Sequence, residues 1–138
     1  MGTVITLLAV VVGGFLALMI GFAFYVRARA RAQEGKPAPA LPGALGAQVA
    51  KGRRALVYFF SPACSACRTI TPRVRELGKK NPAVHLVDVS RDLETARALK
   101  VMATPSFVEI DAGKVLGYHV GPAPADVLAR YAAGAVLA

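Results

Sequence analysis

Two cysteines, Cys64 and Cys67, are the residues of this chain whose type and spacing most directly indicate chemistry. They lie three positions apart, so in a helical turn their side chains share a face with Cβ atoms about 5–6 Å apart. A disulfide needs Cβ atoms about 3.8 Å apart, which is a small adjustment. The pair is therefore able to form and break a disulfide without rearrangement of the domain around it.

The sequence also predicts different roles for the two sulfurs. Residues 55–60 form an apolar run typical of a buried strand, and after a break at Ser61-Pro62 we expect a helix over residues 64–80. Cys64 would then lie at the helix start, where free N–H groups and the positive end of the helix dipole favour a thiolate, the nucleophilic form. Cys67, one turn inside, would resolve the mixed disulfide formed at Cys64.

A Cys-x-x-Cys pair is also half of a common type of metal site. Zinc would need two further ligands, and the only histidines, His85 and His119, lie far apart with no second Cys-x-x-Cys. His85 is expected to be an ordinary strand residue. No metal or organic cofactor is predicted, and Cu(I) carriage by the dithiol stays as a less favoured alternative, since soft thiolates suit that ion.

The first quarter of the chain has a different character. Residues 4–26 contain no charge and nothing more polar than Thr6 and Tyr25. A helix of this length, at about 1.5 Å per residue, covers a hydrocarbon core of about 30 Å. A cleaved signal peptide is the alternative; small residues around Arg29 favour it, and the lack of a basic residue before the run opposes it. We predict a retained single-pass anchor over residues 1–26.

Basic residues follow the apolar run and none precedes it. Because basic residues collect on the cytoplasmic side of a membrane segment, this flank predicts a cytoplasmic domain, with an extracytoplasmic or periplasmic domain as the alternative. The same charges suit contact with anionic lipid. The rest of the net charge of +9 is scattered without aromatic interleaving, so nucleic-acid binding is not predicted. The flank carries Arg27, Arg29, Arg31 and Lys36.

Small residues recur at every fourth position of the predicted anchor. Such a stripe permits close helix packing and hence a weak dimer, although glycine and alanine are common in membrane helices in any case. The stripe consists of Ala9, Gly13, Ala17 and Gly21.

A linker over residues 27–43, basic at first and then rich in proline and alanine, separates the anchor from the domain, residues 44–138. Alternating prolines favour an extended, semi-rigid spacer. Within the domain, the patterns predict helices over 44–51, 93–99 and 124–133, and strands over 83–89, 106–110 and 115–120. This order predicts an α/β fold: a βαβ unit followed by a ββα unit, in a central mixed sheet with helices on both faces.

With these elements in place, the chain resembles the thioredoxin family over roughly residues 44–134. A Cys-x-x-Cys near a βαβ pattern is already a redox signature. The matching features, in chain order, are the Cys64–Cys67 motif, Pro72 in the helix, Thr104-Pro105 before the third strand, and Gly113 and Gly121.

The resemblance implies a thioredoxin-like fold and protein-disulfide reductase activity. In the implied mechanism, Cys64 attacks a substrate disulfide, the mixed disulfide is held against Thr104 and a cis Pro105, and Cys67 releases the reduced substrate. The implied partners are protein thiols and disulfides, with an upstream thiol protein or a membrane carrier as the electron donor. No cofactor is required.

The chain departs from the family's pattern near the cysteines. Ala63 stands where the family usually has tryptophan, Tyr58 where many members bury a proton-accepting aspartate, and Val84 where a lysine often accompanies it. A phenol with a pKa of about 10 is a poor base at neutral pH. We therefore expect a narrower, membrane-associated substrate set than that of a general thioredoxin. A non-catalytic binding or assembly module with this fold is the alternative, which the intact cysteine pair opposes.

Overall fold

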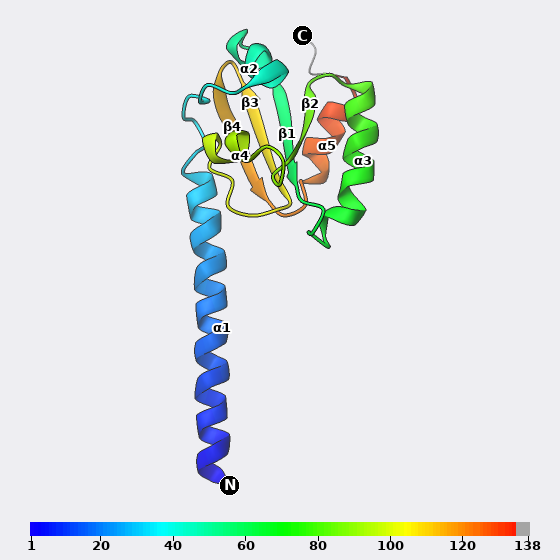
Figure 1. Cartoon of the computed structure of the whole chain (residues 1–138). Helices are drawn as coiled ribbons and strands as arrows, with labels where there is room; N and C mark the ends of the chain where they lie inside the picture. Colours follow the sequence, from blue (N-terminus) through cyan, green and yellow to red (C-terminus); the bar gives the residue numbers. More distant parts are fainter. Residues whose placement is uncertain (135–138) are drawn as a thin grey trace.

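The computed structural model describes residues 1–134, as a long helix leading into an α/β domain (Figure 1). The helices are α1 (Gly2–Arg31), α2 (Gly43–Ala50), α3 (Cys67–Lys80), α4 (Leu93–Ala98) and α5 (Ala125–Ala132). The strands are β1 (Ala55–Phe60), β2 (Val84–Asp88), β3 (Ser106–Asp111) and β4 (Lys114–Val120). Most of these bounds agree with the sequence prediction to within a residue or two.

The four strands form one mixed sheet in the order β2-β1-β3-β4. β1 and β2 are parallel, as a crossover through α3 requires, whereas β1 pairs with β3, and β3 with β4, in antiparallel fashion. Gly113 closes the β3–β4 hairpin with φ +73°, a conformation that favours glycine. The predicted α/β fold with a central mixed sheet is confirmed.

Helices cover both faces of the sheet, which explains why β1 is apolar throughout its length. Leu56 and Tyr58 of β1 face a core shared with α3 and α5, whereas Val57 and Phe59 face a core shared with α2 and α4. All four side chains are fully buried. Burying a large apolar side chain contributes about 1.5–3 kcal/mol, so this strand is the centre of the domain's stability.

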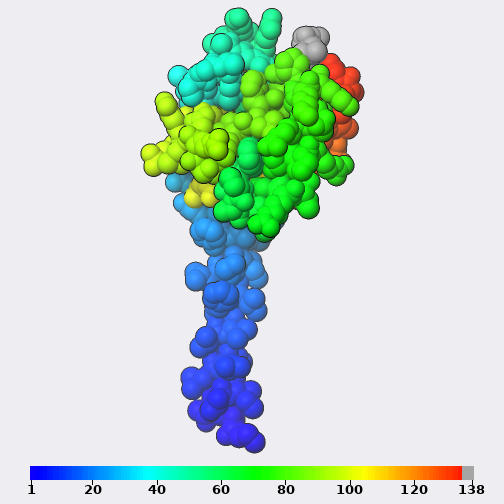
Figure 2. All heavy atoms as spheres, turned by 45° about the vertical axis from the view of Figure 1, so that its right-hand side comes forward, coloured from blue at the N-terminus to red at the C-terminus, as the bar shows by residue number. Residues whose placement is uncertain are grey.

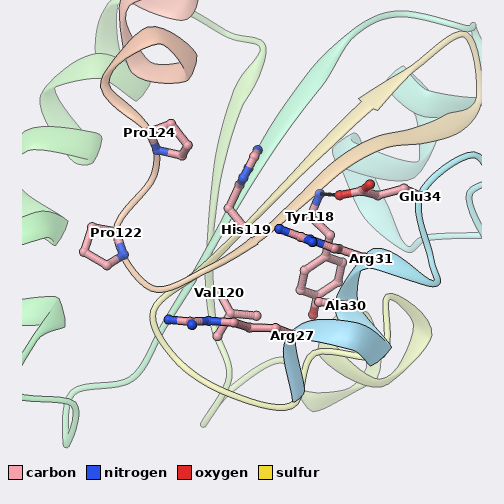
Figure 3. Close-up of a pocket in the computed structure, with 9 residues that line it drawn as sticks. All are labelled: Arg27, Ala30, Arg31, Glu34, Tyr118, His119, Val120, Pro122 and Pro124. Atoms are coloured by element: carbon pink, nitrogen blue, oxygen red, sulfur yellow. Dashed lines mark hydrogen bonds between the residues drawn. The ribbon is translucent and has the colours of Figure 1, made fainter. Parts of the chain in front are cut away.

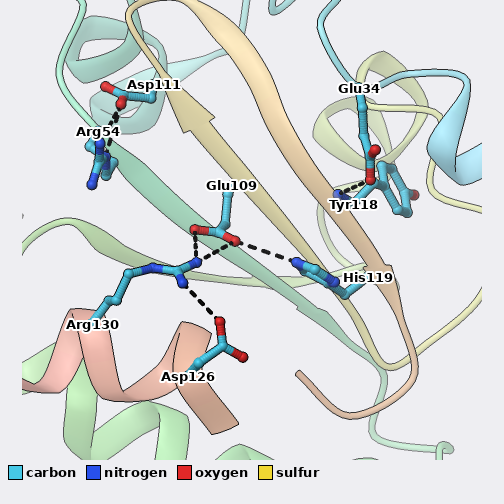
Figure 4. Close-up of polar contacts among 8 residues, drawn as sticks. All are labelled: Glu34, Arg54, Glu109, Asp111, Tyr118, His119, Asp126 and Arg130. Carbon is cyan, nitrogen blue, oxygen red and sulfur yellow. Dashed lines mark hydrogen bonds and ion pairs between the residues drawn. The ribbon is translucent and has the colours of Figure 1, made fainter. Parts of the chain in front are cut away.

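An ion pair between a buried carboxylate and a partly exposed arginine joins α5 to the sheet (Figure 4). Arg130 donates two hydrogen bonds, at 3.1 and 3.2 Å, to the carboxylate of Glu109, which is 4% exposed. Gly117, opposite Glu109 on β4, leaves the space that this cluster needs: an added Cβ would lie 3.2 Å from Nε2 of His119. The charge of Glu109 is thus paired by an arginine of α5, as a buried carboxylate requires.

α3 begins at Cys67 and not at Cys64, so the prediction that both cysteines lie in its first turn is wrong. The N–H of Cys64 donates to the carbonyl of Ser61 at 3.0 Å, and the N–H of Arg68 donates to Ser65 at 3.2 Å. These two successive turns take up residues 61–66 after the strand. Cys64 therefore lies in the turn that leads into the helix.

The segment predicted as an extended spacer is attached to the domain. Residues 35–38 lie along the free edge of β4 and exchange backbone hydrogen bonds of 2.7–2.9 Å with Gly113 and Val115. The carboxylate of Glu34 also accepts a hydrogen bond of 3.2 Å from the N–H of Tyr118. An edge strand presents unpaired N–H and C=O groups, and the extended chain before Pro39 satisfies them.

α1 continues past the predicted anchor and packs against β4 at its carboxyl end. Val26 and Ala30 are 7% and 6% exposed, and Ala30 belongs to the core cluster that contains Tyr118. The apolar part of α1 before Val26 is exposed along its whole length. Among the described residues, α1 is the one helix long and apolar enough to cross a membrane.

Candidate functional site

The two cysteines form a disulfide in the turn between β1 and α3, at the carboxyl end of β1. Their Cα atoms are 5.3 Å apart. Cys67, the first residue of α3, is 2% exposed, whereas Cys64 is only half-buried. An incoming substrate sulfur therefore has better access to Cys64 than to Cys67.

The amino end of α3 supplies electrostatic stabilisation to Cys64. The N–H of Cys67 lies 3.3 Å from Sγ of Cys64 and donates to it. When the disulfide is reduced, this donor and the positive end of the α3 dipole favour the thiolate at Cys64. Although Cys64 lies before the helix and not in it, the predicted difference between the two sulfurs keeps its physical basis.

The position of the expected proton acceptor is filled by the phenol of Tyr58. Its ring is fully buried between Phe60 and Phe107, with ring centroids 5.7 and 4.7 Å away. Its hydroxyl is hydrogen-bonded to Oγ1 of Thr71 at 2.9 Å. Burial raises the pKa of Tyr58, so the phenol stays neutral at physiological pH. The buried strand before the cysteines thus offers no base at this position.

A hollow beside the disulfide is lined by three arginines, Arg68, Arg75 and Arg91. Asp88 is the carboxylate that lines the same hollow, and hydrogen bonds from Ser90 hold its pKa below the usual value. The surface next to the sulfurs is therefore predominantly cationic.

The sequence pattern did not single out these three arginines, because the charge outside the basic flank looks scattered along the chain. Part of this group could have been found from the sequence, because Arg68 and Arg75 are seven residues apart and therefore lie on the same face of α3. The contribution of Arg91 depends on the β2–α4 loop, which the sequence pattern does not place.

Thr104 and Pro105 lie at the same end of the sheet as the cysteines. The peptide bond between them is cis, as predicted. Ser106, the next residue, pairs with Phe59 near the end of β1. The strand register thus brings this loop to the end of the sheet where the cysteines lie. The role of Thr104 and Pro105 in holding a substrate stays a prediction.

The two histidines lie apart from the cysteines. Nε2 of His85 is 2.7 Å from Oε1 of Gln48, and burial lowers the pKa of His85. His119 contacts Glu109 at 3.3 Å. Within residues 1–134, no group of three or more His, Cys, Asp or Glu side chains is arranged to hold a metal ion.

Comparison with known proteins assigns the domain to a family. The family model described as Thioredoxin matches residues 43–133. A thioredoxin H-type from Fagopyrum esculentum is 37% identical over 83 residues, which are 59% of this chain and 72% of the relative. A thioredoxin from Geodia cydonium is 36% identical over 67 residues, 47% of this chain and 63% of the relative.

A solved structure also matches the fold. The reduced thioredoxin pre-protein of Schistosoma mansoni superposes with a TM-score of 0.54 at 34% sequence identity. The match covers 64% of this chain and 88% of that structure.

Proposed function

This chain belongs to the thioredoxin family, and on that premise we propose that it is a membrane-tethered thiol–disulfide oxidoreductase acting through Cys64 and Cys67. Thiol–disulfide exchange is supported by the thioredoxin relatives. The observation that carries the proposal is the Cys64–Cys67 disulfide at the amino end of α3, with the more accessible sulfur receiving the N–H of the other cysteine.

The proposed reaction transfers two electrons by two sulfur exchanges. The thiolate of Cys64 attacks a substrate disulfide, which forms a mixed disulfide and releases one substrate thiolate. Cys67 then loses its proton and attacks Sγ of Cys64, which releases the second substrate thiolate and leaves the Cys64–Cys67 disulfide. Because Tyr58 is neutral, the proton of Cys67 passes to water or to the departing substrate thiolate. The same steps in reverse oxidise a substrate dithiol.

The tether is the part of the proposal that depends on α1. Its exposed apolar surface and the basic residues that follow it support a retained anchor over residues 1–26, with the redox domain in residues 44–138. Residues 135–138 of that division lie outside the described residues. We propose that the domain is cytoplasmic, on the basis of the charge flank, with an extracytoplasmic domain as the alternative.

The test is reduction of insulin disulfides by the full chain in detergent, with dithiothreitol as the electron source. We expect Cys64→Ser to abolish activity above the dithiothreitol background. Cys67→Ser keeps the nucleophile but not the resolving thiol, so it should accumulate a mixed disulfide with insulin that appears on a non-reducing gel. The exposed residue Lys51, which follows α2 at the end of the sheet opposite the cysteines, provides a control, since Lys51→Ala keeps both sulfurs and the residues around them. Full activity of the Cys64→Ser variant would refute the proposed mechanism.

A further inference from the structure

We propose that the structure holds the redox pair at the membrane surface, facing the bilayer, and that its partner is an integral membrane protein with a cysteine pair at that surface. The inference rests on the proposed function, since it assumes that α1 spans a membrane and that Cys64 and Cys67 exchange electrons. It adds the direction in which the site faces and the class of protein that can reach it.

Strand direction shows which way the site faces. Figure 1 shows that the chain after α1 continues away from the amino terminus, and residues 35–38 in this segment pair antiparallel with β4. β4 is antiparallel to β3, and β3 is antiparallel to β1, so β1 runs opposite to α1. The carboxyl end of β1, where the cysteines lie, therefore points back toward the amino terminus of α1 and toward the bilayer. Figure 1 shows the turn between β1 and α3 at the end of the domain from which α1 leaves.

Strand register gives the height of the site relative to α1. Val120, the last residue of β4, lies beside Arg27 and lines the same cavity (Figure 3). Val120 pairs with Ser106, which pairs with Phe59. The chain continues past Phe59 toward the membrane at about 3.3 Å per residue before it turns. Cys64 is therefore level with the last apolar turn of α1, because Arg27 is the first charge after the apolar stretch.

The connection between α1 and the domain fixes this orientation. Val26 and Ala30 are buried against the domain, and the hydrogen bond of Glu34 and the edge pairing of residues 35–38 follow directly. On the other side of the helix, Arg29 and Met102 line one cavity, so the loop before Thr104 also flanks α1. A freely jointed linker would allow every orientation, whereas this continuous contact permits one.

Charge at the same end of the domain suits a bilayer surface. The arginines beside the disulfide, Arg68, Arg75 and Arg91, lie at the end that points toward the membrane, as do Arg27 and Arg31 of α1. Figure 2 shows the segments around residues 60–75 at the lower end of the domain, next to the emerging helix. Anionic headgroups attract arginines that lie within a Debye length of the surface, and this attraction would hold the site toward the membrane.

The consequence is a restriction on partners. A large soluble protein would have to enter the space between the domain and the bilayer to reach Cys64, whereas a membrane-embedded protein with cysteines at the headgroup level already lies there. In the exchange, the partner's dithiol becomes a disulfide as the Cys64–Cys67 disulfide becomes a dithiol, or the reverse, with two electrons and two protons moved.

The orientation is tested by depth measurement on the full chain in phosphatidylcholine/phosphatidylglycerol vesicles. A small fluorophore is attached to Cys64 in the Cys67→Ser variant, and its quenching by lipid spin-labelled at the headgroup is measured. The matched control carries the same label at the exposed position 51, through Lys51→Cys in a Cys64→Ser, Cys67→Ser background; this position follows α2 at the opposite end of the sheet. We expect strong quenching at Cys64 and little at position 51, and equal quenching would overturn the proposal.

The functional consequence is tested by raising the domain without turning it. A seven-residue helical segment, AEAAKAA, is inserted between Tyr25 and Val26; it lifts the domain by about 10.5 Å and turns it by only about 20° from its starting direction. The control receives the same segment between Thr3 and Val4, which leaves the height unchanged. The probe is vesicle phosphatidylethanolamine carrying a pyridyl disulfide on its headgroup, which releases a coloured thione when a thiolate attacks it.

We expect the raised variant to react about tenfold more slowly with the lipid-linked disulfide than the control, because the site no longer reaches the surface. Insulin reduction should be the same in both insertion variants. Equal rates on the lipid probe, with insulin reduction intact, would overturn the inference while leaving the proposed function standing. Failure of the unmodified chain to reduce insulin would instead overturn the proposed function.

Discussion

At the scale of single residues, the site combines an ordinary cysteine pair with an unusual surrounding. The proposed nucleophile, Sγ of Cys64, receives an N–H from Cys67, but the buried position behind it holds Tyr58 instead of a carboxylate. Activation of the first sulfur is therefore built into the backbone, whereas deprotonation of the second depends on solvent or substrate. This division predicts that the tyrosine serves stability and not proton transfer.

Substitution Tyr58→Phe tests that assignment. It removes the hydrogen bond to Thr71 and should lower the free energy of unfolding by about 0.5–1.5 kcal/mol. Because the neutral phenol is no base, the insulin-reduction rate should stay within about twofold of the unmodified chain, well under the effect of removing a general base. Urea unfolding and the insulin assay measure the two quantities. A loss of rate of tenfold or more, with the fold intact, would show that the phenol takes part in the proton transfer.

His85 gives the domain a predictable response to pH. Burial lowers its pKa in the folded state, so the folded state prefers the neutral ring. Its contribution to stability is therefore fully present above the unfolded pKa of about 6.5 and is lost as the pH falls through the lower folded value. The variant His85→Asn should show a flatter fall of thermal stability between pH 7 and pH 5. An unchanged slope would mean that other groups dominate this range.

At the scale of elements, the central strand carries most of the packing. Leu56 of β1 is fully buried against helices α3 and α5, whereas Leu116 of β4 is 56% exposed. Leu56→Ala should lower the free energy of unfolding by about 2–5 kcal/mol, because it leaves a cavity in the core. Leu116→Ala provides the matched control and should change it by less than about 0.5 kcal/mol. Similar effects of the two substitutions would contradict the described core.

The same elements show what the sequence could and could not predict. The apolar run of β1, the Cys-x-x-Cys and the hairpin glycine each depend on local chemistry, and they predicted the sheet and the redox pair. The start of α3 was misplaced by three residues because the turns at Ser61 and Ser65 compete with the helix for the same N–H groups. The docking of residues 35–38 on β4 depends on an edge strand distant in sequence, which no local pattern reports.

At the scale of the whole molecule, the proposed tether makes the side of the membrane decide which redox chemistry the site performs. Disulfides persist outside the cytoplasm, whereas cysteines are kept in the thiol form within it. The basic flank after α1 predicts a cytoplasmic domain and hence a dithiol that reduces its partner. An extracytoplasmic domain would hold the pair oxidised unless a membrane donor supplied electrons, so the location of the domain also determines the direction of electron flow.

Labelling of intact cells with a membrane-impermeant maleimide tests this prediction, and the Cys64→Ser, Cys67→Ser chain is the control because the chain has no other cysteine. A cytoplasmic domain should stay unlabelled in intact cells and become labelled after lysis without added reductant, since its thiols are reduced. Labelling of intact cells only after mild reduction would instead indicate an oxidised, extracytoplasmic domain and would contradict the charge-based topology. The proposed orientation is compatible with either outcome, because it has the turn at Cys64 facing the bilayer from whichever side the domain occupies.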